Sequence, residues 1–143
     1  LSQIKQMAKS NVQVLGWQPD EVVQHYMAQA KAFVYMACED LGMALIEAQA
    51  CGTPVIAYGA GGALETVSDI RLSPDSGTGL LFSPQTEAAL IEAVQTFEQL
   101  SSQFQPEKMQ SHVAQFDQKR FGREYLEFVE RCQKKQFPSE KFG

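Results

Sequence analysis

Two glutamates and a run of glycines are the residues of this sequence best suited to chemistry by their type and spacing. Glu39 and Glu47 bracket the segment DLGMALI, and Gly59, Gly61 and Gly62 follow in the segment GAGG. An ionised carboxylate only accepts hydrogen bonds, so it repels phosphate and favours paired hydroxyls such as those of a sugar or ribose. Backbone amides in a glycine-rich turn have the opposite preference and suit a phosphate group.

The same residues could also have a purely structural role, and their spacing alone does not exclude it. Glutamates are numerous in this chain, and most of them are expected at solvated helix ends. The glycines could simply turn the chain from a strand into the helix ALETV, where Glu65 would support the first turn in the manner of a capping box. The choice between these interpretations depends on the elements that position the residues.

Short β-rich runs alternate with helical segments along the first part of the chain. Valines and aromatic residues indicate the strands, while Pro19 marks the start of a helix and Gly52 the end of another. This alternation implies right-handed crossovers, and so an α/β fold with a Rossmann-like parallel sheet and helices on both faces. Strands are expected at 12–15, 32–36, 54–58 and 80–82, and helices at 22–30 and 41–51.

The expected fold places both glutamates around the start of one helix. Glu39 would follow the second strand, at the edge of the sheet where open α/β folds bind ligands, and Glu47 would lie one to two turns into the next helix. Between them, the amides of Leu41, Gly42 and Met43 lack intrahelical acceptors and sit at the positive end of the helix dipole. Such an end suits a phosphate or a sugar oxygen, and Gly42 would let a ligand approach the backbone closely.

Helical patterns dominate the rest of the chain, at 86–100, 106–116 and 119–134. Their apolar stripes are typical of core or domain contacts, and Thr86 is placed to cap the first of these helices. At the other end, residues 1–9 resemble the tail of a crossover helix, so a further strand is expected upstream. Residues 1–143 are therefore expected to form a single domain within a longer protein.

Composition disfavours several classes of function. The 143 residues carry a net charge of -5, which offers no basic surface for nucleic acid. No apolar run is long enough to cross a membrane, and three cysteines without a CxxC motif suit reduced thiols, which favours a cytoplasmic location. With two histidines a metal cluster is not expected, and the lack of GxGxxG after a first strand disfavours a dinucleotide-binding dehydrogenase.

The order of the motifs resembles a known family. EDLGMALIEAQACGTPVIAYGAGGALETV, followed by TGLLF and TEAALIEAV, is similar to the C-terminal, nucleotide-sugar-binding domain of the GT-B retaining glycosyltransferases called family 4 or group 1. The resemblance covers nearly the whole chain. It implies that a sugar passes from a nucleotide diphosphate donor to a glycan or lipid-linked acceptor, with retention at the anomeric carbon and without a metal cofactor.

The resemblance also implies roles for the residues around the helix start. It places Glu39, the catalytic candidate, beside the donor sugar and Glu47 on the ribose hydroxyls. The amides of Leu41, Gly42 and Met43 would face the sugar and the diphosphate. The commoner family form has Gly-Phe where this chain has Asp-Leu after Glu39, which leaves the shape of the sugar pocket open.

Two further segments belong to the expected donor site. In the family, the loop from Gly16 to Gln18 meets the base, so Trp17 would either border the base or pack half-buried against the protein. Gly61 and Gly62 of the GAGG segment would add a second run of backbone amides.

The residues of these motifs most resemble those of bacterial mannosyltransferases. The resemblance therefore makes GDP-mannose the preferred donor and a UDP-sugar the second choice. The Arg and Lys that neutralise the diphosphate in the family, and its acceptor-binding N-terminal domain, are expected upstream of Leu1. The full-length protein is then expected to act in polysaccharide biosynthesis, with peripheral membrane association, while this segment alone would be inactive. Two alternatives stay open, a GT-B nucleotide-sugar epimerase and a non-catalytic interaction module.

Overall fold

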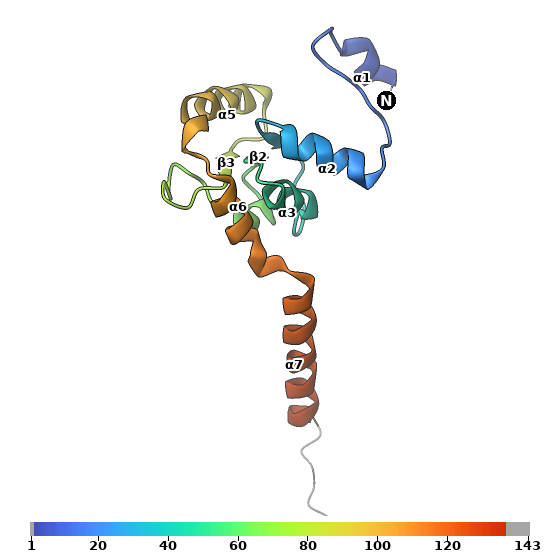
Figure 1. Cartoon of the computed structure of the whole chain (residues 1–143), viewed down its shortest axis with the longest axis vertical. Coiled ribbons are helices and arrows are strands. Elements are labelled where there is room, and N and C mark those ends of the chain that lie inside the picture. The colour runs from blue at the N-terminus through green and yellow to red at the C-terminus, as the bar shows by residue number, and fades with distance from the viewer. Residues whose placement is uncertain (1, 137–143) are drawn as a thin grey trace, which may run out of the picture.

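The computed structural model describes residues 2–136, and its centre is a parallel sheet (Figure 1). Within the described residues the sheet has three strands in the order β1-β2-β3: β1 (Phe33–Tyr35), β2 (Val55–Tyr58) and β3 (Gly79–Phe82). Phe33 is in register with Val55, and Val55 in turn with Gly79. Because the strands are parallel and start at one level, the loops that follow them meet at one edge of the sheet.

Seven α-helices accompany the sheet in residues 2–136, and they confirm the helices expected from the sequence. The helix between β1 and β2 ends as predicted, because Gly52 follows it with a φ of 80°, a conformation that glycine adopts without strain. The helices are α1 (Ser2–Met7), α2 (Asp20–Gln29), α3 (Met43–Ala50), α4 (Ala63–Thr66), α5 (Glu87–Leu100), α6 (Pro106–Val113) and α7 (Gln118–Gln136).

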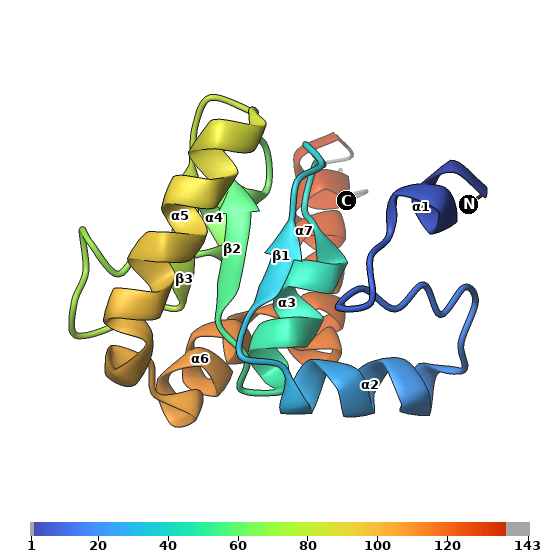
Figure 2. The same cartoon turned by 90° about the horizontal axis from the view of Figure 1, so that it is seen from above.

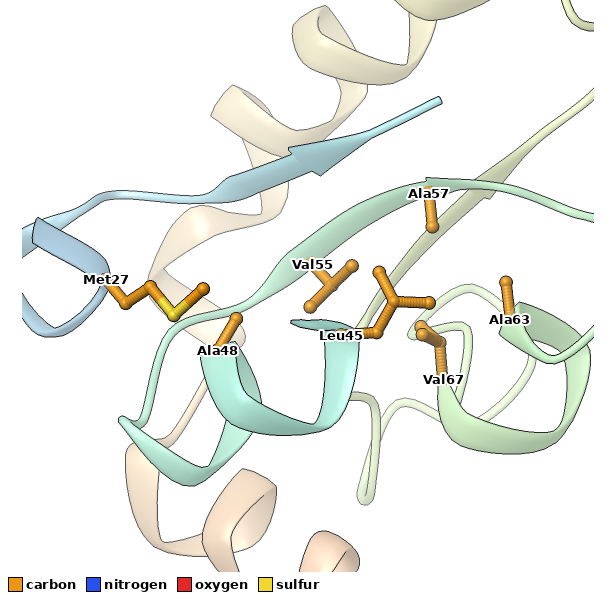
Figure 3. Close-up of a cluster of buried hydrophobic side chains, with 7 residues drawn as sticks. All are labelled: Met27, Leu45, Ala48, Val55, Ala57, Ala63 and Val67. Carbon is orange, nitrogen blue, oxygen red and sulfur yellow. The ribbon is translucent and has the colours of Figure 1, made fainter. Parts of the chain in front are cut away.

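The central strand β2 buries both of its faces, because successive side chains of a strand point to opposite sides. Val55 and Ala57 pack with Leu45 of α3 and with side chains of α2 and α4 (Figure 3). Ile56 points the other way and packs with Phe97 of α5. Figure 2 shows α3 and α5 on opposite sides of the sheet. The predicted fold class, a parallel α/β sheet with helices on both faces, is therefore confirmed.

Thr86 caps α5 as the sequence predicts. Its hydroxyl oxygen accepts a hydrogen bond from the amide of Ala89 at 3.3 Å, which satisfies one of the amides that the first helical turn leaves free. We expect Thr86→Ala to lower the free energy of unfolding by about 1 kcal/mol, whereas Thr86→Ser, which keeps the acceptor oxygen, should change it little. Urea unfolding of the two variants measures the difference, and equal losses would contradict a capping role.

One predicted strand is wrong. Residues 12–15 have irregular backbone, and Val12 and Leu15 are exposed. A strand forms only where a neighbouring strand takes up its backbone hydrogen bonds, and within residues 2–136 the sheet ends at β1. Residues 12–15 therefore have a high β propensity, but no neighbouring strand within residues 2–136 pairs with them. The further strand expected upstream of Leu1 stays a prediction.

The last helix, α7, extends away from the body of the domain (Figure 1). Its apolar stripe is exposed along Phe121, Tyr125 and Phe128, and the rings of Phe121 and Tyr125 stack on each other at 5.7 Å. For this stripe a place in the core, one of the two expectations, is wrong within the described residues. A contact with another domain stays a prediction.

Candidate functional site

The loop after β1 carries Glu39, so the placement expected from the sequence is confirmed. Tyr35, the last residue of β1, contacts the side chain of Glu39. Its hydroxyl donates a hydrogen bond to Oε1 of the carboxylate. This hydrogen bond, together with partial desolvation and the negative charge of Glu39, raises the pKa of Tyr35 above its ordinary value. The carboxylate is thus held by a side chain that no motif of the sequence singled out.

The backbone of the same loop lies directly against the GAGG segment. The Gly62 amide donates to the carbonyl oxygen of Glu39 at 2.7 Å. A Cβ on Gly61 would collide with that same oxygen, and a Cβ on Gly62 would lie 2.5 Å from the carbonyl carbon of Leu41 and 2.6 Å from the carbonyl oxygen of Asp40. These glycines are therefore needed for the close approach of two loops. Their predicted contact with a donor stays a prediction, and the Gly62 amide already has a protein acceptor.

Gly42 is the N-cap of helix α3, and its φ of 77° needs the conformational freedom of glycine. Among the described residues no side chain caps this helix, and its first amide with an acceptor is that of Leu45, which donates to Gly42 O at 2.9 Å. The side chains of Leu41 and Met43 on either side are exposed. The amides at the start of α3, at the carboxyl edge of the sheet, thus have no protein acceptor among the described hydrogen bonds, as the sequence predicts. Gly42 itself is buried against Leu45, so the close approach of a ligand to its backbone stays a prediction.

Glu47 lies on the exposed side of α3 and lines a groove of about 280 Å³ between α2 and α3. Asp20 and Gln24 of α2 line the other side of the groove, so its polar groups are mainly hydrogen-bond acceptors. Glu39 is not among the lining residues. The two glutamates therefore lie on different parts of the surface. Glu47 lines the groove, and Glu39 lies in the loop at the edge of the sheet.

A second cavity, of about 350 Å³, adjoins this groove and is mainly apolar. Gly16 lines it together with Tyr26 and Phe33, and the cavity shares Val23 and Met27 with the groove beside Glu47. A planar base would fit such a lining, as the sequence interpretation expects for the loop at Gly16.

Trp17, the neighbour of Gly16, lines neither cavity and is 87% exposed. The alternative that Trp17 packs half-buried against the protein is therefore wrong. Its predicted position at the border of the base stays a prediction.

Asp69 and Arg71 form a second polar cluster that the sequence interpretation missed. The Asp69 side chain is 4% exposed and accepts four hydrogen bonds, from the amide, Nε and Nη2 of Arg71 and from the amide of Leu81. Burial by itself would raise the pKa of Asp69, but the hydrogen bonds from Arg71 and Leu81 outweigh it and lower the pKa below its ordinary value. The cluster fastens the segment before β3 onto that strand. The only sign in the sequence was an acid and a base two positions apart in a turn-rich stretch.

The structure thus brings the predicted site residues into two groups. Glu39, Leu41, Gly61 and Gly62 pack together at the sheet edge, next to the free helix start at Gly42 and Met43, while Glu47 and Gly16 line adjoining cavities. Within residues 2–136 no group of histidine, cysteine and acidic side chains could hold a metal ion. No helix in that range is long and apolar enough to cross a bilayer.

Comparison with known proteins relates the chain to glycosyltransferases. The family described as glycosyl transferases group 1 matches residues 3–117. The chain is 35% identical over 65 residues to an O-antigen chain mannosyltransferase B of Escherichia coli, which covers 45% of this chain and 17% of that protein. It is 36% identical over 78 residues to a D-inositol 3-phosphate glycosyltransferase of Kineococcus radiotolerans, with 53% of this chain and 18% of the relative covered.

Two solved structures share the fold. A sucrose-phosphate synthase from Thermosynechococcus elongatus superposes with a TM-score of 0.75 and 27% identity over 92% of this chain and 33% of its own. HepE of Anabaena, solved in complex with UDP, gives a TM-score of 0.71 and 26% identity over 91% of this chain and 35% of its own. The chain therefore spans about a third or less of the length of these relatives. Since the family match extends over most of its residues, the chain belongs to the glycosyl transferases group 1 family.

Proposed function

We propose that this chain is the donor-binding part of a retaining glycosyltransferase, which holds a nucleotide sugar while the rest of the protein binds a glycan or lipid-linked acceptor. One observation carries the proposal. The start of α3 has amides without a protein acceptor among the described residues at the carboxyl edge of a parallel sheet, with Glu39 in the loop before the helix and Glu47 in its second turn. Free amides suit a diphosphate and carboxylates suit sugar hydroxyls, so the arrangement fits a ligand that has both.

Within this proposal each group has a role. The amides of Leu41, Gly42 and Met43 face the diphosphate and the sugar, and Glu39 accepts a hydrogen bond from the sugar beside the reacting carbon. Glu47 accepts the ribose hydroxyls from the groove, and the apolar cavity at Gly16 receives the base, with Trp17 near its mouth. No metal takes part in the proposed chemistry, because the free amides at the helix start and basic residues expected elsewhere in the protein would balance the diphosphate charge.

GDP-mannose is the proposed donor and a UDP-sugar the second choice. A mannosyltransferase among the curated relatives supports the first, and the complex of HepE with UDP supports the second. We also propose a cytoplasmic location, which the three free cysteines favour, and an acceptor at the membrane surface. Product analysis of the full-length protein separates a transferase from an epimerase, because an epimerase turns over its nucleotide sugar without an acceptor.

Glu47→Gln tests the ribose contact. The substitution keeps the size of the side chain but removes the charge that strengthens its hydrogen bonds, so we expect the affinity for a nucleoside diphosphate to fall about tenfold. Isothermal titration of the full-length protein with GDP, UDP and ADP measures this change.

Glu98→Gln on α5 provides the matched control, because Glu98 is exposed and makes no described side-chain hydrogen bond. It should leave the affinity unchanged. If none of the three nucleotides binds the unaltered protein, the proposal fails and a non-catalytic interaction module becomes the better account.

A further inference from the structure

Tyr35 is held in place independently of Glu39. It is the last residue of β1, where the register of the sheet sets it beside Ala57. Its ring stacks on Phe33 with a centroid distance of 6.1 Å and an interplanar angle of 19°, and both rings pack against the buried cluster around Leu45. The hydroxyl is therefore presented at the carboxyl edge of the sheet by an aromatic ring that the core fixes.

Glu39, in contrast, lies in a loop and is held at two points. Its carbonyl oxygen accepts from the Gly62 amide at 2.7 Å, and its carboxylate Oε1 accepts from the Tyr35 hydroxyl. The first contact places the backbone of the residue. Only the second, among the described hydrogen bonds, sets the direction of the side chain.

We propose that Tyr35 is the positioning residue for Glu39, and that it aims the second carboxylate oxygen at the donor sugar. This inference rests on the proposed function, since it deepens the role of Glu39 in the same site. The hydroxyl has one proton to donate, which goes to Oε1, and Oε2 keeps its full capacity to accept a sugar hydroxyl. A carboxylate that is held in place before the ligand arrives loses less side-chain freedom on binding, so the sugar is bound more tightly.

The effect should appear on the sugar and not on the nucleotide. Tyr35 touches Glu39, whereas the groove at Glu47 and the cavity at Gly16 do not include Tyr35. The informative quantity is therefore the ratio of two affinities, that for the nucleotide sugar and that for the nucleoside diphosphate without sugar. A general loss of structure would lower both affinities and leave their ratio unchanged.

The experiment is titration of the full-length protein and its Tyr35→Phe variant with GDP-mannose and GDP, and with UDP-glucose and UDP. For whichever pair binds, we expect Tyr35→Phe to lower the preference for the nucleotide sugar about threefold to tenfold, with the affinity for the nucleotide alone unchanged. Tyr58→Phe is the matched control. Tyr58 ends the neighbouring strand β2, packs on Phe82, and its hydroxyl makes no described hydrogen bond, so the ratio should stay as in the unaltered protein.

A double variant shows whether Tyr35 acts through Glu39. Glu39→Gln by itself should lower the ratio about tenfold, and adding Tyr35→Phe should lower it no further, because the tyrosine then has no charged carboxylate to hold. Additive losses in the double variant, or an unchanged ratio in Tyr35→Phe, would overturn the inference. A higher ratio in Tyr35→Phe would also overturn it, because the tyrosine would then be holding Glu39 away from the sugar.

The outcomes also distinguish this inference from the proposed function. If Glu39→Gln lowers the ratio and Tyr35→Phe does not, only the positioning role of Tyr35 fails. If neither nucleotide sugar binds more tightly than its nucleotide, and Glu39→Gln changes nothing, the placement of Glu39 beside the sugar fails as well.

Discussion

Gly62→Ala should both destabilise the domain and weaken donor binding. Alanine tolerates the φ of -61° that Gly62 adopts, so the backbone conformation itself is not the obstacle. The obstacle is space, because the new Cβ would lie 2.5 Å from the carbonyl carbon of Leu41 and 2.6 Å from the carbonyl oxygen of Asp40, which are backbone atoms that cannot rotate away. The loop that carries Glu39 must move, and the hydrogen bond from the Gly62 amide to Glu39 O must lengthen or break.

We expect the free energy of unfolding to fall by about 1 to 3 kcal/mol, the usual size of overpacking in a closely packed region. Because Glu39 is displaced with its loop, the affinity for a nucleotide sugar should fall at least about tenfold, the loss expected for one hydrogen bond to a charged group. Urea unfolding and titration with GDP-mannose and UDP-glucose measure the two effects.

Gly122→Ala provides a control with the same chemical change. Gly122 lies within α7, where a Cβ would meet nothing within 4 Å, and alanine is the better helix former by up to about 1 kcal/mol. This variant should therefore be as stable as the unaltered protein or more stable. If Gly62→Ala behaves like Gly122→Ala, the two loops do not need the close approach seen in the structure.

Asp69→Asn should lower stability by about 2 to 3 kcal/mol at neutral pH. The asparagine cannot accept all four hydrogen bonds, because its amide group would point a donor at donors of Arg71 or Leu81. This loss of stability is smaller than the loss for a fully buried ion pair. The side chain of Arg71 is half exposed, so water can hydrate its guanidinium in the variant. Asp75→Asn is the control, since Asp75 is exposed and makes no described hydrogen bond, and it should change stability by less than about 0.5 kcal/mol.

The pH dependence of the Asp69 contribution follows from the lowered pKa of its carboxyl group. In acid the unfolded chain takes up a proton at Asp69 before the folded protein does, so protonation favours unfolding. The contribution is therefore complete above the ordinary aspartate pKa of about 4 and is lost as the pH falls through the lower pKa of the folded state. We expect the difference between the unaltered protein and Asp69→Asn to shrink as the pH falls below the ordinary aspartate pKa of about 4. A difference that stays constant down to the pH at which the folded protein unfolds in acid would contradict a charged Asp69 in the folded protein.

Much of the fold could be predicted from the sequence because it is encoded locally. The alternation of β-rich and helical runs, the glycine after α3 and the threonine before α5 each act over a few neighbouring residues, and each was found where expected. The strand at 12–15 failed for the opposite reason. Its residues have the right propensity, but a strand also needs a partner that the local pattern cannot supply.

The candidate site divides in the same way. That Glu39 would follow a strand and Glu47 would lie within the next helix could be predicted, since both follow from where these two elements begin and end. Tyr35 could not be singled out, because a strand followed by a loop has no fixed period that would bring a residue and its fourth neighbour together. The Asp69 cluster was missed because it is completed by the amide of Leu81 on β3, which follows only after a long turn. The acid and the base two positions apart do not indicate that contact by themselves.

The sequence by itself determined the type of each main element, the family, and the free helix start between two carboxylates. Only the tertiary structure showed that Gly61 and Gly62 allow two loops to approach closely, which side chain holds Glu39, and which cavities lie beside Glu47 and Gly16. The physical reason is that helix and strand formation depend on neighbours along the chain. The contact of two loops depends instead on how closely the elements that carry them pack, and for Gly62 that packing leaves no room for a single methyl group.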